Sequence, residues 1–437
     1  MKWPRRFRKW LASPRSLTVL GLLLIVQIIS LTWLISASGP VTLSVVVPAE
    51  EAVGWSELVD NFEHEYPNIL IDLVQGPYTT EEVNVIYSSA FQRDTPYDLV
   101  YMDVIWLSSF ASRGWLRDLS DFLSAEERAA FLTSEIEAGT FEDRLYRIPF
   151  RADVGTFYYR QAVLDQAGIA VPKTLSELEQ AVNALGSGLD DSRNRTTSHG
   201  YLWQGEQYEG LVAFFVELLD GYGGYWLNPD TLEVGLDEAG AIAAAQFLQT
   251  LLTENVSPTA VRDYTEIESL AGFEAGLGTF MRHWGYVGKP LLQTDQTIGL
   301  TSLPNGPKGK TRACRGGWGF AIAANTPHLA AAQTAIRYFT SAAIQRQFAM
   351  TTGYLPSRRD LFTAPALVEQ YPYFPDLLSW LENPALSKFR PQIAQYDSAS
   401  QILQRALGKI VNQSQEPVAA MQQAAQETRD LLSTEID

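Results

Sequence analysis

The sequence predicts an α/β fold in which short strands alternate with amphipathic helices. A β-branched segment at 42–47 ends at Pro48, as a short strand does. Apolar residues then recur at helical spacing until Pro67, and a second apolar strand covers 69–74. Strands that alternate with helices indicate a mainly parallel sheet with helices on both faces.

The alternation continues with a helix over 81–93 and a third strand over 98–102, which ends at Asp103. Ligands of such sheets bind outside the carboxyl ends of the strands, so Asp103 lies at a candidate ligand position. The segment 145–159 is mostly strand-like, with interruptions at Pro149 and at 153–155.

Helical patterns dominate 172–253 and begin with Thr174-x-x-Glu177, which has the form of a capping box. A strand followed by a loop is expected at 279–285, and a glycine-rich loop followed by a strand at 316–323. Four amphipathic helices are expected near the end of the chain, at 328–340, 342–351, 399–411 and 417–433.

The first 40 residues have the pattern of a segment that directs the chain out of the cytoplasm. Six Lys and Arg, without any Asp or Glu, precede the uncharged apolar segment 17–35. Basic residues stay on the cytoplasmic side, and about 20 apolar residues span a membrane as a helix. The helix is either an uncleaved anchor or a signal sequence cleaved near 36–38. Because Cys314 is the only cysteine, no lipid-modified cysteine follows it.

Composition restricts the classes of partner. The 437 residues hold 33 Lys and Arg against 50 Asp and Glu, and this acidic balance disfavours nucleic acid and anionic lipid as partners. Beyond the leader, the chain is longer than one hydrophobic core usually organises, so two lobes are expected. The single cysteine excludes an internal disulfide, and the four scattered histidines lack metal-site spacing. We expect no metal and no cofactor.

A series of short motifs resembles the extracellular solute-binding proteins of sugar ABC transporters, and more specifically their trehalose/maltose-binding branch. The strongest match is the segment 203–211, Trp-Gln-Gly-Glu-Gln-Tyr-Glu-Gly-Leu. Supporting motifs, in chain order, lie at 101–106, 114–116, 146–149, 153–155, 158–160, 281–284, 303–306, 316–318, 353–359 and 390–391. The resemblance extends from about Val41 to the C-terminus.

The resemblance implies a periplasmic-binding-protein-like fold: two α/β lobes with a ligand cleft between them, preceded by one N-terminal transmembrane or signal helix, here within 1–40. It places the lobe exchanges near 150–154, 283–287 and 338–342. Lobe 1 is then 41–150 with 287–338, and lobe 2 is 154–283 with 342–437. It also implies a non-catalytic monomer that binds a sugar or glycoside, closes by hinge bending and docks on the permease subunits of an ABC transporter, outside the cytoplasm.

The motifs also suggest which residues bind the ligand. A sugar needs aromatic platforms for its CH faces together with carboxylates, amides and arginines for its hydroxyls. By position in the family motifs, the candidate ligand-binding residues are Glu51, Asp103, Asp153, Trp284, Gly317, Trp318 and Arg390. A second group either contacts the ligand or only packs the walls: Trp106, Arg151, Gln204, Tyr208 and Tyr354. Trp203 is expected in the core.

Two departures from the trehalose/maltose branch affect the expected ligand. The relatives have an arginine early in the second helix, where this chain has Glu82-Val83. They also have a tyrosine two residues before the aspartate that corresponds to Asp153, where this chain has Arg151. Arginine and tyrosine differ in reach and in donors. Trehalose, maltose, sucrose and glucosylglycerol therefore all remain candidates.

Three other functions fit parts of the same pattern. Paired carboxylates among aromatic side chains also describe an exported glycoside hydrolase or transglycosidase. A solute-binding fold also serves as a sensor without transport, and the cleft of such a fold also binds other solutes such as polyamines or oligopeptides.

Overall fold

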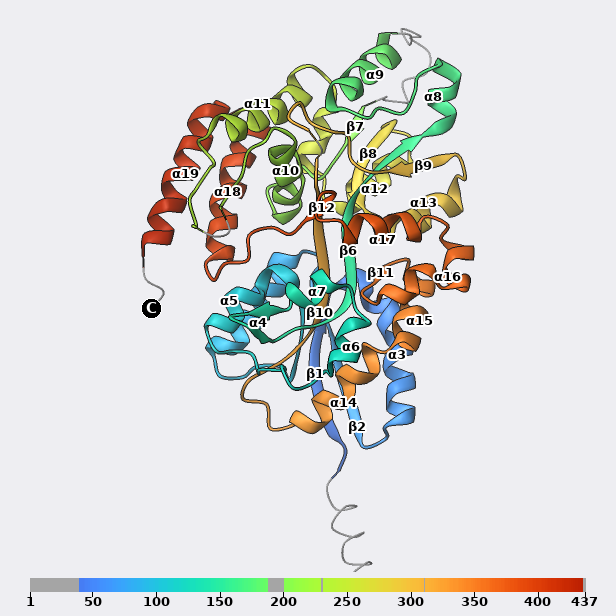
Figure 1. Cartoon of the computed structure of the whole chain (residues 1–437), viewed down its shortest axis with the longest axis vertical. Helices are drawn as coiled ribbons and strands as arrows, with labels where there is room; N and C mark the ends of the chain where they lie inside the picture. The colour runs from blue at the N-terminus through green and yellow to red at the C-terminus, as the bar shows by residue number, and fades with distance from the viewer. Residues whose placement is uncertain (1–38, 188–199, 229–230, 310, 435–437) are drawn as a thin grey trace, which may run out of the picture.

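Two long strands, β6 (Ile148–Arg160) and β10 (Ala313–Ile322), run through the middle of the molecule and belong to both of its halves (Figure 1). The computed structural model describes residues 39–187, 200–228, 231–309 and 311–434. The two strands pair antiparallel with each other, from Arg315 opposite Val154 to Phe320 opposite Ile148. The predicted two-lobed α/β fold is confirmed.

One half, which we call lobe 1, is built on β1, β2 and β3. The predicted β-α-β opening is confirmed, because β1 and β2 pair in parallel with helix α3 between them. Strand β3 pairs with the C-terminal half of β10. The elements of this lobe besides the shared strands are β1 (Val41–Val47), α3 (Ala52–Glu65), β2 (Ile69–Gln75), α4 (Thr80–Gln92), β3 (Leu99–Asp103), α5 (Leu107–Ser112), α6 (Ala125–Ala129), α7 (Thr133–Glu137), the hairpin β4–β5 (Thr140–Phe141 and Arg144–Leu145), α14 (Leu329–Phe339) and α15 (Ala342–Thr352).

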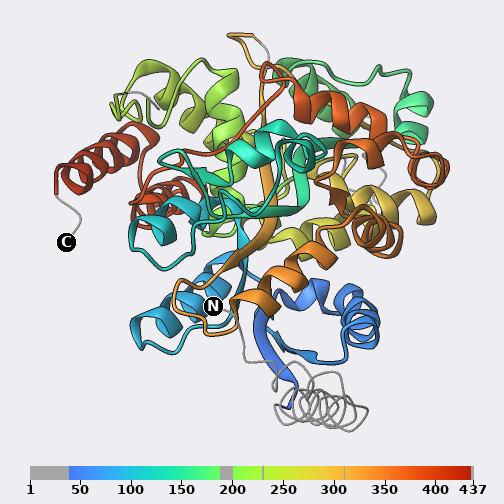
Figure 2. The same ribbon diagram turned by 60° about the horizontal axis from the view of Figure 1, so that its bottom comes forward.

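The other half, lobe 2, forms around the C-terminal half of β6, which pairs antiparallel with β8 and β9. Helices α10, α11, α18 and α19 pack together at one side of it in both views (Figures 1 and 2). Its elements are α8 (Gln161–Ala167), α9 (Leu175–Ser187), β7 (Tyr201–Leu202), α10 (Glu209–Gly221), α11 (Ala239–Thr253), α12 (Glu266–Glu274), β8 (Phe280–Trp284), α13 (Gly288–Thr294), β9 (Ile298–Thr301), α18 (Tyr396–Val411) and α19 (Pro417–Ser433). The remaining segments are β11 (Leu355–Pro356), α16 (Pro365–Gln370), α17 (Phe374–Glu382) and β12 (Ser387–Lys388).

Local sequence signals explain where several of these elements begin. Thr174 accepts the backbone N–H of Glu177, whose carboxylate accepts the backbone N–H of Thr174, so the predicted capping box is present. The apolar face predicted for the first helix is buried, with Trp55 and Phe62 almost fully covered. Helices α14, α15 and α19 lie within one residue of their predicted bounds, whereas α18 begins three residues early, at Tyr396.

The prediction of a mainly parallel sheet is wrong. Among the described strands, β10 and β6 pair antiparallel with each other. Strand β10 also pairs antiparallel with β3, and strand β6 also pairs antiparallel with β8, β9 and β11. The alternation of strands and helices predicts parallel pairing only for neighbours joined by a helical crossover. Strands far apart in sequence, as β3 and β10 are, follow no such rule.

The glycine-rich segment 316–319 was expected as a loop, and this too is wrong, because it lies inside β10. A Cβ on Gly319 would lie 2.4 Å from the carbonyl oxygen of Ile148 in β6, and one on Gly317 would lie 2.9 Å from that of Arg151. Glycine is needed here for close pairing of the two strands. Pro149 does not interrupt β6, because the register shifts beside it and the bulge accommodates the proline.

The structure differs from the expected lobe boundaries after residue 287. Strand β9, inside the segment expected in lobe 1, pairs with β6 residues Phe157–Arg160 of lobe 2. Helix α15, inside the segment expected in lobe 2, packs against α3 of lobe 1 (Figure 1). We infer that the chain passes between lobes along β6 and β10.

The expected anchor or signal helix at 17–35 lies outside the described residues. Among those residues, none of the helices has the length and apolarity needed to cross a membrane.

Where β6 changes partners, a buried ion pair fills the space beside a glycine. Glu217 of α10 accepts two hydrogen bonds from Arg282 of β8, at 2.7 and 2.8 Å, and one from the backbone N–H of Cys314. The pair is almost fully buried. A Cβ on Gly155 would lie 2.0 Å from Glu217 Oε1 and 3.1 Å from Arg282 Nη2. This glycine therefore makes room for the pair that joins α10, β8 and β10.

We predict that Gly155→Ala destabilises the protein by about 3–5 kcal/mol, the usual cost of disrupting a buried ion pair. Urea denaturation measures this difference in unfolding free energy. The matched control is Gly186→Ala in α9, where an added Cβ has no heavy atom within 4 Å, and it should change stability by less than about 1 kcal/mol. Equal stability of the two variants would contradict the role assigned to Gly155.

Candidate functional site

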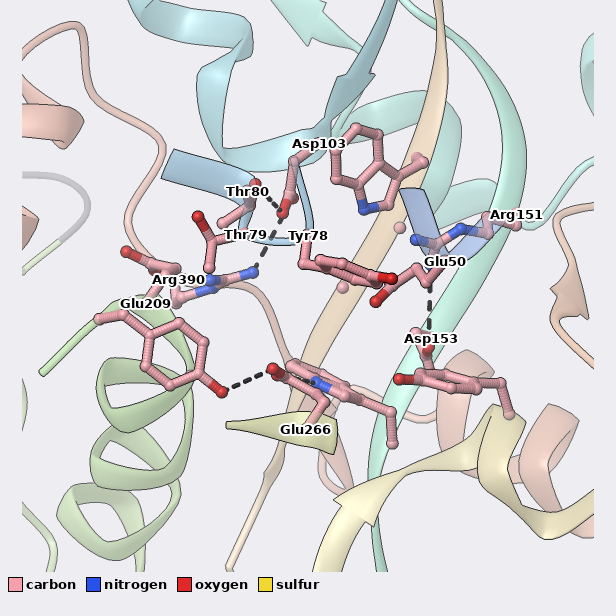
Figure 3. Close-up of a pocket in the computed structure, with 17 residues that line it drawn as sticks. Glu50, Tyr78, Thr79, Thr80, Asp103, Arg151, Asp153, Glu209, Glu266 and Arg390 are labelled. Carbon is pink, nitrogen blue, oxygen red and sulfur yellow. Dashed lines mark hydrogen bonds and ion pairs between the residues drawn. The ribbon is translucent and has the colours of Figure 1, made fainter. Parts of the chain in front are cut away.

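A cavity that is partly open to solvent, with about 630 Å³ of empty space, lies between the two lobes, and its walls are acidic and aromatic (Figure 3). Lobe 1 contributes the ends of β1 and β3 and the loop before α4, and lobe 2 contributes the start of α10, α12 and the end of β8. The lining carboxyl groups belong to Glu50, Asp103, Asp153, Glu209 and Glu266. The aromatic rings belong to Tyr78, Tyr208, Trp284, Tyr286 and Trp318, and the guanidinium groups to Arg151 and Arg390.

Asp103 lies at the end of β3 and faces Arg390 from lobe 2 (Figure 3). Its Oδ2 accepts a 3.1 Å hydrogen bond from the hydroxyl of Thr80, and its Oδ1 accepts the N–H of Ile105. Arg390 Nη2 lies 4.0 Å from Asp103 Oδ1, beyond hydrogen-bond distance. A ligand hydroxyl placed between these two groups can donate to the carboxylate and accept from the guanidinium.

Arg390 is held in place by Glu209, the first residue of α10. Its Nη1 donates to Glu209 Oε1 at 2.6 Å, and Tyr396 donates to the same oxygen. Ser400 donates to Glu209 Oε2 at 2.5 Å. The charge of Arg390 is therefore balanced inside lobe 2, and only its second nitrogen is turned toward Asp103.

Arg151 is likewise balanced before any ligand arrives. Its Nε and Nη2 donate to Glu51 Oε1 at 2.9 and 2.6 Å, and Tyr101 donates to the other carboxylate oxygen at 2.7 Å. The guanidinium lies over the ring of Tyr354, 4.3 Å from its centroid. Glu51 is thus fully buried beneath the cavity wall, and its neighbour Glu50 lines the cavity instead.

Two of the lining acids have raised pKa values, although only Asp153 is buried and Glu50 is exposed to the solvent of the cavity. The protein surroundings of the cleft, together with the charges of Glu51 and Glu266, raise the pKa of Glu50 to about 8. Burial also raises the pKa of Asp153 to about 7, although Arg151 and the backbone N–H groups of Val154 and Gly285 oppose this shift. At neutral pH these groups therefore include protonated carboxyls, which donate as well as accept hydrogen bonds.

Trp284, at the end of β8, has a fixed orientation. Its indole N–H donates to Glu266 Oε1 at 3.0 Å, and Tyr208 donates to Glu266 Oε2 at 2.6 Å. Arg282 covers one face of the indole, 4.3 Å from the ring centroid. Only the opposite face is therefore available to the cavity, where an apolar sugar face can stack on it.

His283 helps to fix Trp284 and Glu266. Its Nδ1 accepts the backbone N–H of Trp284, so its Nε2 donates to the backbone carbonyl of Glu266. Burial lowers the pKa of this histidine to about 4, which keeps it neutral.

Trp318 differs from Trp284, because its ring packs among Tyr101 and Trp106 and is only 6% exposed.

The structure brings six of the seven principal candidates to the cavity and leaves out Glu51. The six are Asp103, Asp153, Trp284, Gly317, Trp318 and Arg390. Of the second group, Arg151 and Tyr208 line the cavity, whereas Trp106, Gln204 and Tyr354 do not. Gln204 is buried, where its amide donates a hydrogen bond to Ser269 and accepts one from Arg282. Trp203, expected in the core, is fully buried, and its indole N–H donates to the hydroxyl of Ser257. Ligand contact by the lining residues stays a prediction.

Several lining residues did not emerge from the sequence. Tyr78, Thr79 and Thr80 follow the carboxyl end of β2, so the strand-end rule that selected Asp103 would have found them. Glu209 lies inside the motif at 203–211 but was not selected. Glu50 lies beside the candidate Glu51, and the sequence leaves the choice between these two acids to the register of the turn. Glu266 and Tyr286 gave no distinguishing signal.

Within the described parts of the chain, no group of three or more His, Cys, Asp or Glu side chains is arranged to hold a metal ion. The cleft acids interact with the two arginines and with backbone, hydroxyl and indole donors.

Comparison with known proteins identifies the family. Residues 48–346 match the family described as bacterial extracellular solute-binding protein, which is more than half of the chain. The chain belongs to this family. A probable ABC transporter-binding protein of Deinococcus radiodurans is 27% identical over 360 residues, 80% of this chain and 84% of that protein. The maltotriose-binding protein of Pyrococcus abyssi is 23% identical over 60% of this chain and 55% of its own length.

Solved structures of similar proteins agree with the fold. Maltose-bound MalE3 of T. maritima has a TM-score of 0.82 and 28% identity over 90% of this chain and 100% of its own. The GacH receptor of Streptomyces glaucescens, at 19% identity, shares the fold with a TM-score of 0.79, over 91% of this chain and 100% of its own. The family that residues 48–346 match consists of solute-binding proteins, so this chain is a solute-binding protein and not an enzyme.

The pKa values predict how the stability of this solute-binding protein changes with pH. A carboxyl group whose pKa is raised by folding stabilises the folded state below its unfolded value, and this contribution disappears as pH rises through the folded value. For Glu50 the window runs from about 4.5 to about 8. The unfolding free energy of the ligand-free protein should therefore fall between pH 5 and pH 9.

Glu50→Gln should reduce this fall and should be more stable than the wild type at pH 9 by up to about 1 kcal/mol, because Glu50 is exposed to the solvent of the cavity and solvent screens its charge. Chemical denaturation at both pH values measures the effect. Glu57→Gln, on the exposed face of α3, is the control and should follow the wild type. A Glu50→Gln profile parallel to that of the wild type would contradict the assignment.

Proposed function

We propose that this protein is the sugar-binding component of an ABC importer, and that it captures a neutral disaccharide or glycosylated osmolyte of the trehalose, maltose, sucrose or glucosylglycerol type. The observation behind this proposal is the cavity between the lobes. One face of Trp284 is held open beside Glu266 and opposite Asp103 and Arg390, which suits the apolar face and the hydroxyl rim of a sugar.

The charges of the cavity favour a neutral ligand over an anion. Both lining guanidinium groups already have carboxylate partners, Arg151 with Glu51 and Arg390 with Glu209. An anion would meet five lining carboxyl groups without a cation of its own. The departure noted at Arg151 therefore adds little free positive charge to the cavity, because Glu51 neutralises it.

The relatives support the sugar class. MalE3 of T. maritima was solved with maltose, and the relative from Pyrococcus abyssi is a maltotriose-binding protein.

The family and the leader support the proposal that the protein delivers its ligand to a permease. The family is extracellular, which places the binding domain outside the cytoplasm. The basic segment and the apolar stretch at 17–35 support attachment to the outer face of the membrane, where a short tether raises the effective concentration of the receptor near its permease. We propose that the protein acts there as a monomer.

A thermal-shift screen tests the proposal. A glycoside of the correct class should stabilise the chain from Val41 onward by about 2.7 kcal/mol at a concentration one hundred times its Kd. No shift with trehalose, maltose, sucrose, glucosylglycerol or other glycosides would overturn the sugar assignment. A shift with a polyamine or an oligopeptide alone would replace it.

For the glycoside that binds, Trp284→Ala should weaken affinity by about tenfold or more, because tenfold corresponds to about 1.4 kcal/mol and stacking on an aromatic ring contributes a similar amount. The matched control is Trp115→Ala, since Trp115 also has a guanidinium over its ring, that of Arg113 at 5.0 Å, but lies away from the cavity. Calorimetry should give the control an affinity within about twofold of the wild type.

A further inference from the structure

The amino end of helix α10 in lobe 2 is capped by a side chain from lobe 1. The N-cap residue, Tyr208, makes no capping hydrogen bond with its own side chain. Instead the backbone N–H of Glu209 donates to Oε1 of Glu81, which lies 128 positions earlier in the chain, in the first turn of α4. The first N–H groups of a helix have no partner inside the helix, and the carboxyl oxygen of Glu81 supplies an acceptor for one of them.

Other polar contacts join the same two faces. Gln404 of α18 donates to Glu81 Oε1 at 3.4 Å. Nearby, Ser109 of α5 donates to Asp397 of α18 at 3.0 Å. In each contact one partner belongs to lobe 1 and the other to lobe 2, so an opening of the cleft that separates α4 and α5 from α10 and α18 breaks them together.

We propose that Glu81 is an inter-lobe latch, a positioning residue that holds the cleft closed by capping helix α10 from the opposite lobe. The proposal rests on the binding function proposed above, but the contact itself needs no ligand. It differs from the cavity residues, because Glu81 does not line the cavity.

The latch lies directly beside the ligand cavity. Thr80, the neighbour of Glu81, lines the cavity and donates to Asp103, and Glu209 and Gly210 line it from the other lobe. A ligand that draws Asp103 and Arg390 together therefore also brings the carboxyl of Glu81 onto the N–H of Glu209. Ligand contacts and the cap form in the same movement, so each stabilises the other.

Protonation should modulate the latch. Burial and the charge of Glu209 raise the pKa of Glu81 to about 8 in the closed arrangement. The acids that face it are Glu209 on α10, Glu266 on α12 and Asp397 on α18, and Arg390 is already paired with Glu209. When the cleft opens, Glu81 regains water and its pKa falls toward its ordinary value. Closure therefore takes up a proton and weakens as pH rises through about 8.

The test measures opening without a ligand. Spin labels attached at Glu57→Cys on α3 and Gln246→Cys on α11, both exposed, report the distance between the lobes of the full chain by pulsed electron resonance. The native Cys314 is buried and stays unlabelled. Glu81→Ala should lower the ratio of closed to open molecules by about fivefold, the factor that corresponds to loss of a helix cap. Glu82→Gln, an exposed neighbour on α4, is the matched control and should leave the ratio unchanged.

Glu81→Gln separates capping from protonation, because its amide oxygen still accepts the N–H of Glu209 but does not titrate. At pH 6 it should keep a closed fraction within about twofold of the wild type, and its closed fraction should fall less between pH 6 and pH 9. Glu50 and Asp153 titrate in the same range, so the latch is measured as the difference between the two proteins. If the closed fraction of Glu81→Ala equals that of the wild type, the latch is overturned. If the pH profile of Glu81→Gln is identical to that of the wild type, the proton dependence of the latch is overturned.

The same variants distinguish failure of the latch from failure of the proposed function. If a glycoside binds, Glu81→Ala should raise its Kd by about fivefold, mainly through faster dissociation. If no glycoside in the panel binds but Glu81→Ala still opens the lobes, the latch stands and the sugar assignment falls. If a glycoside binds with equal affinity to the wild type and to Glu81→Ala, the binding function stands and the latch falls.

Discussion

The antiparallel pairing of β6 with β10 is the constraint on which the rest of the structure depends. The two strands belong to both lobes, and they place Arg151, Asp153, Gly317 and Trp318 where the lobes meet. The pairing is close only because glycines replace larger residues along it. At Gly155, where β6 leaves β10 and pairs with β8, the missing side chain leaves space for the Glu217–Arg282 pair. At Gly317 it leaves space beside Glu135, whose carboxylate lies between Arg147 and Arg315.

This construction buries many charges around the cavity and neutralises them within the protein. Arg151, Arg282 and Arg390 each have a carboxylate partner that is itself buried. Such pairs add little net stability, because the cost of removing both ions from water is high. Their effect is to hold side chains in one geometry. Glu50 lines the cavity without a cation partner, so it is available to ligand hydroxyls beside the free face of Trp284, whereas Glu266 already accepts from Trp284 and Tyr208.

The sequence was sufficient for features that depend on local patterns. The β1–α3–β2 opening and the helices near the end of the chain follow from periodicity, and Asp103 follows from its place at the end of a strand. Features that depend on tertiary contacts were not accessible. Glu50 and Glu51 are adjacent acids in one 3₁₀ turn (Ala49–Glu51), and only the packing of Arg151 and Tyr101 decides which of them is buried. The glycines at 316–319 have the composition of a loop, and only the approach of β6 makes them part of a strand.

A crystal structure with the best-bound glycoside tests the central claim most directly, namely that a sugar is held in the cavity between the lobes. The account predicts electron density for one glycoside in the cavity, with a sugar ring stacked on the free face of Trp284. It also predicts hydroxyl groups within hydrogen-bond distance of both Asp103 and Arg390, the two groups that are 4.0 Å apart across the cleft. A glycoside bound elsewhere on the protein, with the cavity between β3, β8 and α10 unoccupied, would contradict it.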